Sequence, residues 1–263
     1  MNILVCIKQV PGTTNVEVDP VTGVLKRDGV QSKLNPYDLY AIETALTLRE
    51  SYGGTVDTIT MGPDQAKSVI LESIYMGVDG GTVVSDRRFA GSDVLATSYT
   101  LAQAIKVTNK SYDIILCGKQ TTDGDTAQVG SELAELLSIP HITYVNSIVS
   151  VSDRYITVRS GNEYSVITSK IALPCLICVD SDINTPRLPS YKRKKYTDDN
   201  IVRFMSLDNF ADRDESHYGL KGSATQVERV FSPDKKKEKT MIEGTSSQLS
   251  DSLYELLKDK KFI

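Results

Sequence analysis

Residues 117–130 combine the residue types of an anion-binding loop. They read Cys-Gly-Lys-Gln-Thr-Thr-Asp-Gly-Asp-Thr-Ala-Gln-Val-Gly and follow a short apolar run at 112–116, which predicts a buried strand. Residues 132–137 have the composition and spacing of a helix. The first N–H groups of a helix are unpaired, and its dipole favours negative charge there. A strand, a polar loop and a helix start together therefore predict a site suited to a phosphate.

Individual residues of the loop support this interpretation. Thr126 and Gln128 add side-chain donors, and Gly118, Gly124 and Gly130 would let the backbone approach a ligand closely. The loop is neither a Walker loop nor a GxGxxG fingerprint. Its chemistry alone therefore leaves two alternatives open, a nucleotide site and a junction that holds only water.

Composition narrows the class of protein. The chain has 263 residues, of which 40% are hydrophobic, and this is ample for one large domain. A net charge of −4 argues against wholesale nucleic-acid binding. No apolar run approaches the roughly 18 residues of a membrane span, and the first residues lack the features of a signal peptide. We expect a soluble cytoplasmic protein.

The cysteines and histidines predict neither a metal site nor a redox pair. Cys175 and Cys178 form a CxxC, but their segment has the composition of a strand, where residues three apart point to opposite faces. There is no second CxxC, and His141 and His217 are far away in sequence. We expect buried free thiols, as in a reducing compartment.

The first 140 residues alternate between strand and helix patterns. We expect strands at 2–8, 55–61, 82–85 and 112–116, and helices from 35 to about 52, at 65–76, from 92 to about 106 and at 132–137. Asn35 is a good N-cap, and Pro36 suits the first helical position. Such alternation predicts a parallel sheet with right-handed crossovers. Ligands bind such sheets at the carboxyl ends of strands, near the topological switch point.

After residue 140 the composition and the pattern of the sequence change. Four segments rich in Val, Ile, Thr and Tyr, at 142–151, 155–159, 164–168 and 174–179, predict an antiparallel extension of the sheet. From Asn184 onward the chain is polar and irregular, with basic runs at 192–195 and 235–237, until a last helix at 247–260. We expect an α/β domain over 1–185. Residues 186–263 should form an arm on the outside of this domain or on a partner.

Four motifs in register carry a family resemblance. They are Lys-Gln-Val-Pro at 8–11, Asn-Pro-Tyr-Asp at 35–38, Met-Gly-Pro at 61–63 and the loop at 117–130. In this order and spacing, the chain resembles the beta subunit of electron-transfer flavoprotein from residue 1 to about 200, and more loosely to the end. Residues 158–163 match the family's acidic-Gly-Gly signature only in part, and Ser131 stands where a Pro is common.

The resemblance implies a doubly wound, mainly parallel sheet of the adenine-nucleotide-binding type, with an antiparallel extension and a C-terminal arm. It also implies a heterodimer with an alpha subunit, whose FAD exchanges electrons with a dehydrogenase. The beta subunit holds a nucleotide of its own. The implied contacts are Cys6 beside the adenine, then Asn35, Pro36, Tyr37, Asp38 and Met61, with Gly118, Lys119, Gln120, Thr121, Thr122, Asp123, Gly124, Asp125, Thr126, Ala127, Gln128 and Val129 around ribose and phosphates.

The nucleotide is AMP in simple electron-transporting members of the family and a second FAD in electron-bifurcating members. Small residues at Gly124, Thr126 and Ala127 favour FAD, because they leave space for a pyrophosphate. NADH would then supply a hydride, and the two electrons would pass to a dehydrogenase and to ferredoxin or flavodoxin. Structural AMP is the alternative. A stand-alone adenosine-nucleotide-binding protein is an alternative of another class.

The basic segment at 186–195 lies where the family has its partner-recognition loop. The resemblance implies an apolar anchor there, either Leu188 or Tyr191, with Lys192 and Arg193 steering the encounter. The alternative is a solvated basic loop. The partner class is open among acyl-CoA, enoyl-CoA-like and 2-hydroxy acid dehydrogenases.

Overall fold

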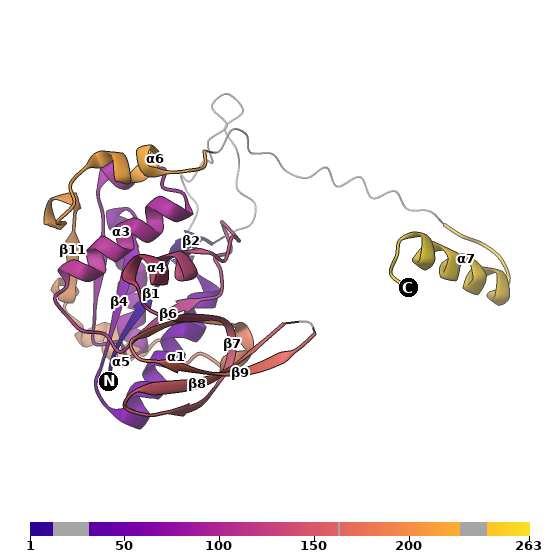
Figure 1. Ribbon diagram of the computed structural model, residues 1–263, viewed down its shortest axis with the longest axis horizontal. Helices are drawn as coiled ribbons and strands as arrows, with labels where there is room; N and C mark the ends of the chain where they lie inside the picture. The colour runs from indigo at the N-terminus through magenta and orange to yellow at the C-terminus, as the bar shows by residue number, and fades with distance from the viewer. Residues whose placement is uncertain (13–31, 163, 227–240) are drawn as a thin grey trace. The chain divides into compact units, whose positions relative to one another are not determined.

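The computed structural model describes residues 1–12, 32–162, 164–226 and 241–263, which are coloured in Figure 1. The chain divides into two compact units, Met1–Glu228 and Arg229–Ile263. The first holds the α/β fold, and the second holds helix α7 (Ser246–Asp259). The basic run predicted at 235–237 lies outside the described residues. Across the described ranges, no helix is both long and apolar enough to cross a membrane.

A nine-stranded sheet in the order β11-β5-β4-β1-β6-β10-β7-β8-β9 forms the first unit (Figure 1). The pairings from β11 to β7 are parallel, and β7, β8 and β9 pair antiparallel. This confirms the predicted fold class. The strands are β1 (Asn2–Cys6), β4 (Thr55–Met61), β5 (Gly80–Val84), β6 (Ile114–Gly118), β7 (His141–Val151), β8 (Tyr155–Gly161), β9 (Val166–Ala172), β10 (Cys175–Val179) and β11 (Val202–Met205).

Helices cover both faces of the parallel part. Helices α1 (Pro36–Tyr52) and α2 (Lys67–Met76) bury apolar residues in one core, and α3 (Val94–Val107) and α4 (Val129–Leu137) bury theirs in a second core. The chain adds β4 and β5 on one side of β1, then returns to place β6 on its other side. Right-handed crossovers in opposite directions put helices on opposite faces. The switch point therefore lies between β1 and β6.

Shorter elements complete the first unit. A small antiparallel pair, β2 and β3, precedes α1. Two short helices come later in the chain, α5 after β10 and α6 after β11. Their bounds are β2 (Gln9–Pro11), β3 (Ser32–Leu34), α5 (Tyr191–Tyr196) and α6 (Gly219–Gly222), with 3-10 turns η1 (Asp64–Ala66), η2 (Arg87–Phe89), η3 (Ser181–Ile183), η4 (Asp199–Ile201), η5 (Leu207–Asn209) and η6 (Glu215–His217).

Two strands of the nine-stranded sheet differ from the prediction. Strand β10 was expected in the antiparallel extension, but it runs parallel between β6 and β7. All five of its residues are buried, as expected for a strand covered on both faces. Strand β11 falls in the segment expected to be irregular. Its sequence, Val-Arg-Phe-Met, is too short and too mixed in polarity to predict a strand. The strand forms because this segment pairs with β5.

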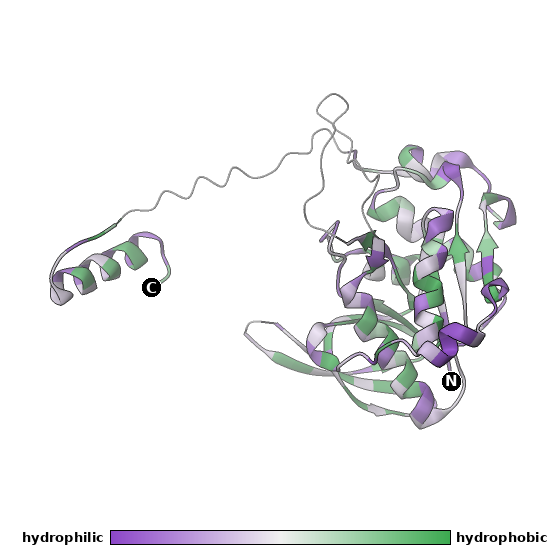
Figure 2. Cartoon of the chain, turned by 180° about the vertical axis from the view of Figure 1, so that it is seen from behind, coloured by the Kyte–Doolittle hydropathy of each residue, from purple (hydrophilic) through white to green (hydrophobic). Residues whose placement is uncertain are grey.

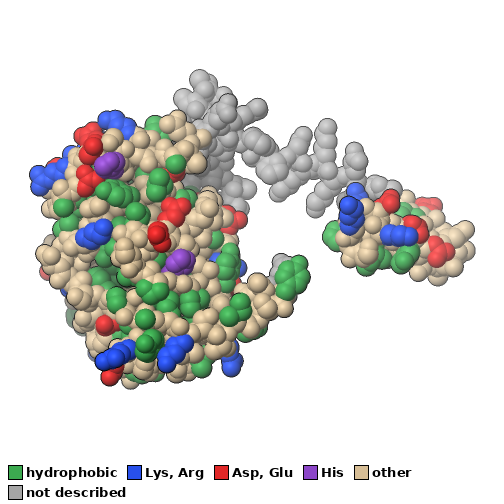
Figure 3. All heavy atoms as spheres, in the orientation of Figure 1, with side chains coloured by type: hydrophobic (Ala, Val, Ile, Leu, Met, Phe, Trp, Pro, Cys, Tyr) green, Lys and Arg blue, Asp and Glu red, His purple; other side chains and the backbone are tan. Residues whose placement is uncertain are grey.

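The antiparallel strands keep apolar side chains on their surface. Tyr164, Val166 and Ile167 are exposed, and Figure 3 shows hydrophobic side chains out to the tip of the projecting strands. By contrast, Figure 2 shows the helices of the parallel part as mixed hydrophobic and hydrophilic ribbons, since each has one face toward a core.

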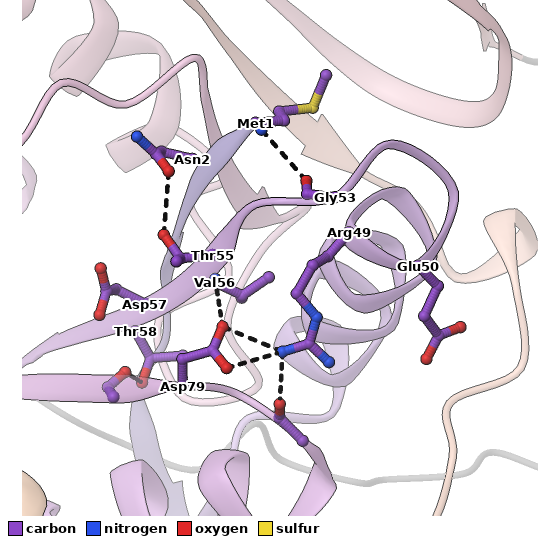
Figure 4. Close-up of polar contacts among 12 residues, drawn as sticks. Met1, Asn2, Arg49, Glu50, Gly53, Thr55, Val56, Asp57, Thr58 and Asp79 are labelled. Atoms are coloured by element: carbon purple, nitrogen blue, oxygen red, sulfur yellow. Dashed lines mark hydrogen bonds and ion pairs between the residues drawn. The ribbon is translucent and has the colours of Figure 1, made fainter.

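Polar contacts close the amino edge of the sheet (Figure 4). Asp79, just before β5, accepts a hydrogen bond from the Val56 N–H at 2.8 Å and two from Nη1 of Arg49 at 3.1 Å. The same Arg49 nitrogen donates to the Gly77 carbonyl at 2.9 Å. One carboxylate therefore joins α1, β4 and the turn between α2 and β5.

We predict that Asp79→Ala lowers the free energy of unfolding by about 1–3 kcal/mol, because it leaves the buried Val56 N–H without its acceptor. Urea unfolding of the purified protein measures the change. The control is Asp153→Ala, in an exposed turn between β7 and β8, which should stay within about 0.5 kcal/mol of wild type. Equal stability of the two variants would contradict the role of Asp79.

Candidate functional site

The candidate site lies at the carboxyl ends of β1 and β6, at the switch point. Cys6 on β1, Cys117 on β6 and Cys178 on β10 are register partners, so three thiols form a row across neighbouring strands. All are buried and free, which confirms the predicted free thiols, and Cys175 packs in the opposite core. A hydrogen bond with Cys117, together with burial, raises the pKa of the Cys178 thiol well above its ordinary value. The Cys178 thiol therefore stays uncharged.

Asn35 joins the start of α1 to the loop after β6. It occupies the N-cap position, but its side chain does not cap the helix, so that part of the prediction is wrong. Its Nδ2 donates to Oδ1 of Asp38 at 2.9 Å and to the Gln120 carbonyl at 2.8 Å, and its Oδ1 accepts from the Thr122 N–H at 3.3 Å. The amide is used to hold the loop, and Pro36 starts the helix instead.

Asp38 extends this connection to the end of β1. Its buried carboxylate accepts the Lys8 N–H at 2.7 Å through Oδ2, while Oδ1 accepts from Asn35. Asn35 and Asp38 were predicted as nucleotide contacts. The structure turns both side chains inward, where they position the segments around them.

Two of the three glycines in the motif serve the protein's own packing. A Cβ at Gly118 would overlap Asp38 and the Tyr37 backbone, and one at Gly130 would overlap the Cys178 thiol. Both glycines bring α1 and α4 close to the strand ends, and their expected role toward a ligand stays a prediction. Gly124 differs, because the nearest atom to its Cβ position is Oγ1 of Thr121 at 3.3 Å.

The loop presents backbone donors next to a helix start. Asp125 and Ala127 have left-handed backbone conformations, with φ of 51° and 55°. Turns of this kind direct successive N–H groups into a concavity that suits an anion. Within the described part of the chain, no side chain caps α4 at Gln128. The dipole and free N–H groups of this nine-residue helix are therefore open to a negatively charged group.

The acidic side chains of the loop are already engaged. Asp123 pairs with Nζ of Lys8 at 2.8 Å, and Asp125 accepts a hydrogen bond from Gln120. Burial alone would raise the pKa of Asp123, but the hydrogen bond and the charge of Lys8 bring it below its ordinary value. The ion pair reduces the repulsion that Asp123 would exert on a phosphate.

The remaining predicted contacts lie along the same edge. Cys6 ends β1, Met61 ends the neighbouring β4, and Tyr37 begins α1. Gln120 Nε2 lies 3.5 Å from the Tyr37 hydroxyl. The structure thus brings the three separate motifs and the loop at 118–129 together around the switch point.

The predicted partner-binding residues lie in a second surface region, the segment at 186–195. Arg187 binds both carboxylate oxygens of Glu43, at 2.8 and 2.9 Å, and one oxygen of Glu50 at 2.6 Å. This fixes the loop to α1. Leu188 and Tyr191 are 88% and 80% exposed, so both side chains are presented to solvent. Lys192 and Arg193 follow in the exposed helix α5.

Sequence reasoning missed several residues of these two places. Asp180 directly follows β10 and binds Nζ of Lys119 at 3.0 Å, and a carboxylate at a strand's carboxyl end could have been noticed. Arg187 and Tyr144 gave no such signal, because their partners are distant in sequence. Nζ of Lys119 lies 5.1 Å from the Tyr144 ring centroid.

Comparisons with known proteins show the family to which the chain belongs. Residues 22–199 match the model of the electron transfer flavoprotein domain. The chain is 40% identical over 263 residues to the electron transfer flavoprotein subunit beta of Clostridium acetobutylicum, with all of both chains covered. It is 41% identical over 265 residues to subunit CarD of the caffeyl-CoA reductase-Etf complex of Acetobacterium woodii, again over all of both chains. Protein FixA of Azorhizobium caulinodans is 40% identical over 259 residues, or 96% of this chain and 92% of that one.

The α/β fold and these matches together place the chain among electron-transfer proteins. The chain belongs to the beta-subunit family of electron transfer flavoproteins.

Asp38 should make stability depend on pH. Burial raises its pKa from 3.8 to about 7, although its hydrogen bonds to Asn35 and Lys8 act in the other direction. The folded protein thus holds the proton more tightly than the unfolded chain does. The resulting stability is fully present below pH 3.8 and is lost as pH rises through about 7.

We predict that Asp38→Asn flattens this part of the profile of unfolding free energy against pH. Urea unfolding at intervals between about pH 4 and pH 8 measures it, with Asp153→Asn as the exposed control. A profile in Asp38→Asn that keeps the wild-type slope would assign the pH dependence to other groups.

Proposed function

We propose that the loop at 118–129 holds an FAD, and that the chain pairs with an alpha subunit in NADH-dependent electron bifurcation. The observation that carries this proposal is the loop with its left-handed turns, which ends at the uncapped start of α4 at the switch point. Bound FAD would accept a hydride from NADH and release the electrons singly. This makes the chain the electron-transfer subunit of a flavin oxidoreductase complex.

The residues present fit such a group. The N–H groups of α4 and of the loop would bind the phosphates, and Gly124 adds no side chain there. Asn35 forms a hydrogen bond with the loop backbone, and Asp38 joins Asn35 to the Lys8 N–H. The backbone donors of the loop are therefore positioned before a ligand binds. The protein's task is to bind and orient the cofactor, and no side chain has to act as acid, base or nucleophile.

The choice of FAD over AMP rests on the loop, and the choice of partners rests on a relative. Gly124, Thr126 and Ala127 are small, which suits a pyrophosphate with a further group beyond it. CarD is by name a subunit of a caffeyl-CoA reductase-Etf complex. By extension we propose a flavin dehydrogenase of the acyl-CoA or 2-hydroxy acid type as one acceptor, and ferredoxin or flavodoxin as the other. AMP in the same loop is the alternative.

Contact with the alpha subunit is proposed for the arm over 186–263. Leu249, Leu253 and Leu256 are exposed on α7, where hydrophobic colour lies beside hydrophilic colour in Figure 2. An amphipathic helix is stabilised chiefly by packing its apolar face. We propose that the alpha subunit covers this face, while Leu188 or Tyr191 engages the dehydrogenase.

We predict that acid extraction of the purified heterodimer releases two FAD, one of them from this chain. Chromatographic quantification of the extracted nucleotides measures the ratio. One FAD with one AMP would sink the bifurcation proposal and leave the family assignment intact.

We predict that Gly124→Val removes the nucleotide of this chain but leaves the alpha flavin. A Cβ at Gly124 would lie 3.3 Å from Oγ1 of Thr121, a contact that a small shift of this side chain relieves, so the variant should fold with a bulkier loop. Gly124→Ala is the matched control, and it should keep most of the nucleotide. Full nucleotide content in folded Gly124→Val would show that the phosphates bind elsewhere.

We predict that Leu188→Ala with Tyr191→Ala slows electron transfer to the dehydrogenase while NADH still reduces the flavin. A buried anchor can contribute about 2 kcal/mol or more to an interface. Lys192→Glu with Arg193→Glu should instead lower the association rate and flatten its salt dependence. Stopped-flow traces separate the two effects. Wild-type rates in both double variants would make this loop a solvated surface.

A further inference from the structure

Tyr144 has an unusual backbone conformation. It lies in β7 with φ of 56°, in the left-handed region that aromatic residues rarely adopt, and its side chain is 43% exposed. Such a residue costs on the order of 1–3 kcal/mol and persists where its surroundings hold it. The register between β10 and β7 shifts between Ile177 and Val179, so Tyr144 lies in a β-bulge, a feature that often re-aims a side chain next to a binding site.

The register of the sheet places Tyr144 at the edge that carries the loop. Gly118 on β6 pairs with Val179 on β10, and Val179 pairs with Val145 on β7. Lys119 and Asp180 directly follow this row, and Tyr144 directly precedes it. Two strand spacings separate β6 from β7, or roughly 10 Å. Tyr144 therefore lies beside the loop, on the side away from β1 and β4.

The ring is held in place from two directions. Nζ of Lys119 lies 5.1 Å from its centroid, in cation–π range, and 3.0 Å from Oδ2 of Asp180. The Asp180 N–H donates to the Val145 carbonyl at 2.8 Å, which fixes the backbone next to Tyr144. Lys119 and Asp180 neutralise each other, so this place suits a planar, uncharged ring better than another phosphate.

Resting on the proposed FAD, we propose that Tyr144, positioned by Lys119 and Asp180, is a binding subsite for the flavin ring. AMP ends at its phosphate and has no further group that could contact Tyr144. FAD continues beyond its phosphates through a ribityl chain to a flat ring system, which an aromatic face can stack against. Tyr144 would thus be a residue by which this site prefers FAD to AMP.

The test uses the intact heterodimer after its flavins have been removed. FAD is titrated alone and in competition with AMP, so that the AMP-displaceable fraction reports this chain's site. The variants are Tyr144→Ala and Tyr144→Phe. Tyr155→Ala is the matched control, because Tyr155 is 42% exposed on β8 with Nζ of Lys170 at 4.4 Å from its ring.

We expect Tyr144→Ala to weaken FAD binding at this site about threefold to tenfold, the size of one aromatic stacking contact, with AMP affinity unchanged. Tyr144→Phe should keep the FAD affinity. Because a phenol stacked on a flavin quenches its emission, bound FAD should fluoresce more in both variants. Tyr155→Ala should match wild type in every measurement.

Several results would overturn the subsite. They are unchanged FAD affinity in Tyr144→Ala, equal weakening of FAD and AMP, and loss of the heterodimer with FAD affinity intact, which would make Tyr144 a subunit contact. A wild-type site that takes AMP and refuses FAD would refute the proposed function and the subsite together. Normal FAD binding by both wild type and Tyr144→Ala would refute the subsite alone.

Discussion

Two buried polar side chains, Asn35 and Asp38, hold together the segments that build the functional edge of this protein. Asp38 accepts a hydrogen bond from the Lys8 N–H, just after β1. Asn35 forms hydrogen bonds with the backbone of Gln120 and Thr122 in the loop after β6. Both are almost fully removed from solvent. A buried polar group that loses its partner is costly, so the bonds to Lys8, Gln120 and Thr122 favour a single arrangement of the loop.

The proposed anion site depends on this arrangement, because its donors are backbone N–H groups of the loop and of α4. Its backbone turns and the start of α4 are useful to an anion only if they are aimed beforehand, since ordering them on binding would cost conformational entropy. The residues packed at the strand ends beneath the loop contribute close packing. Gly118 sits against Asp38, and Gly130 sits against Cys178, so α1 and α4 approach the strand ends as closely as a bare backbone allows.

The proposed nucleotide site and the proposed partner loop lie in the same compact unit, Met1–Glu228. The loop at Leu188 is tied by Arg187 to Glu43 and Glu50 of α1, and the Ser190 N–H bonds the Tyr75 carbonyl at the end of α2. Helix α1 therefore takes part in both places, through Asp38 at its start and Glu43 and Glu50 further along. This division suits a protein that holds one cofactor firmly while it meets another protein briefly.

The sequence by itself determined the α/β class, the alternation of strands and helices, and the loop at 117–130, because these follow from local periodicity and turn residues. Tertiary structure decided what depends on distant partners. It placed β10 inside the parallel sheet, formed β11 by pairing with β5, and turned Asn35 and Asp38 inward. It also joined Tyr144 to Lys119. Local pattern reports which face a residue prefers, but a hydrogen bond or an ion pair forms only where folding brings two separate segments within reach.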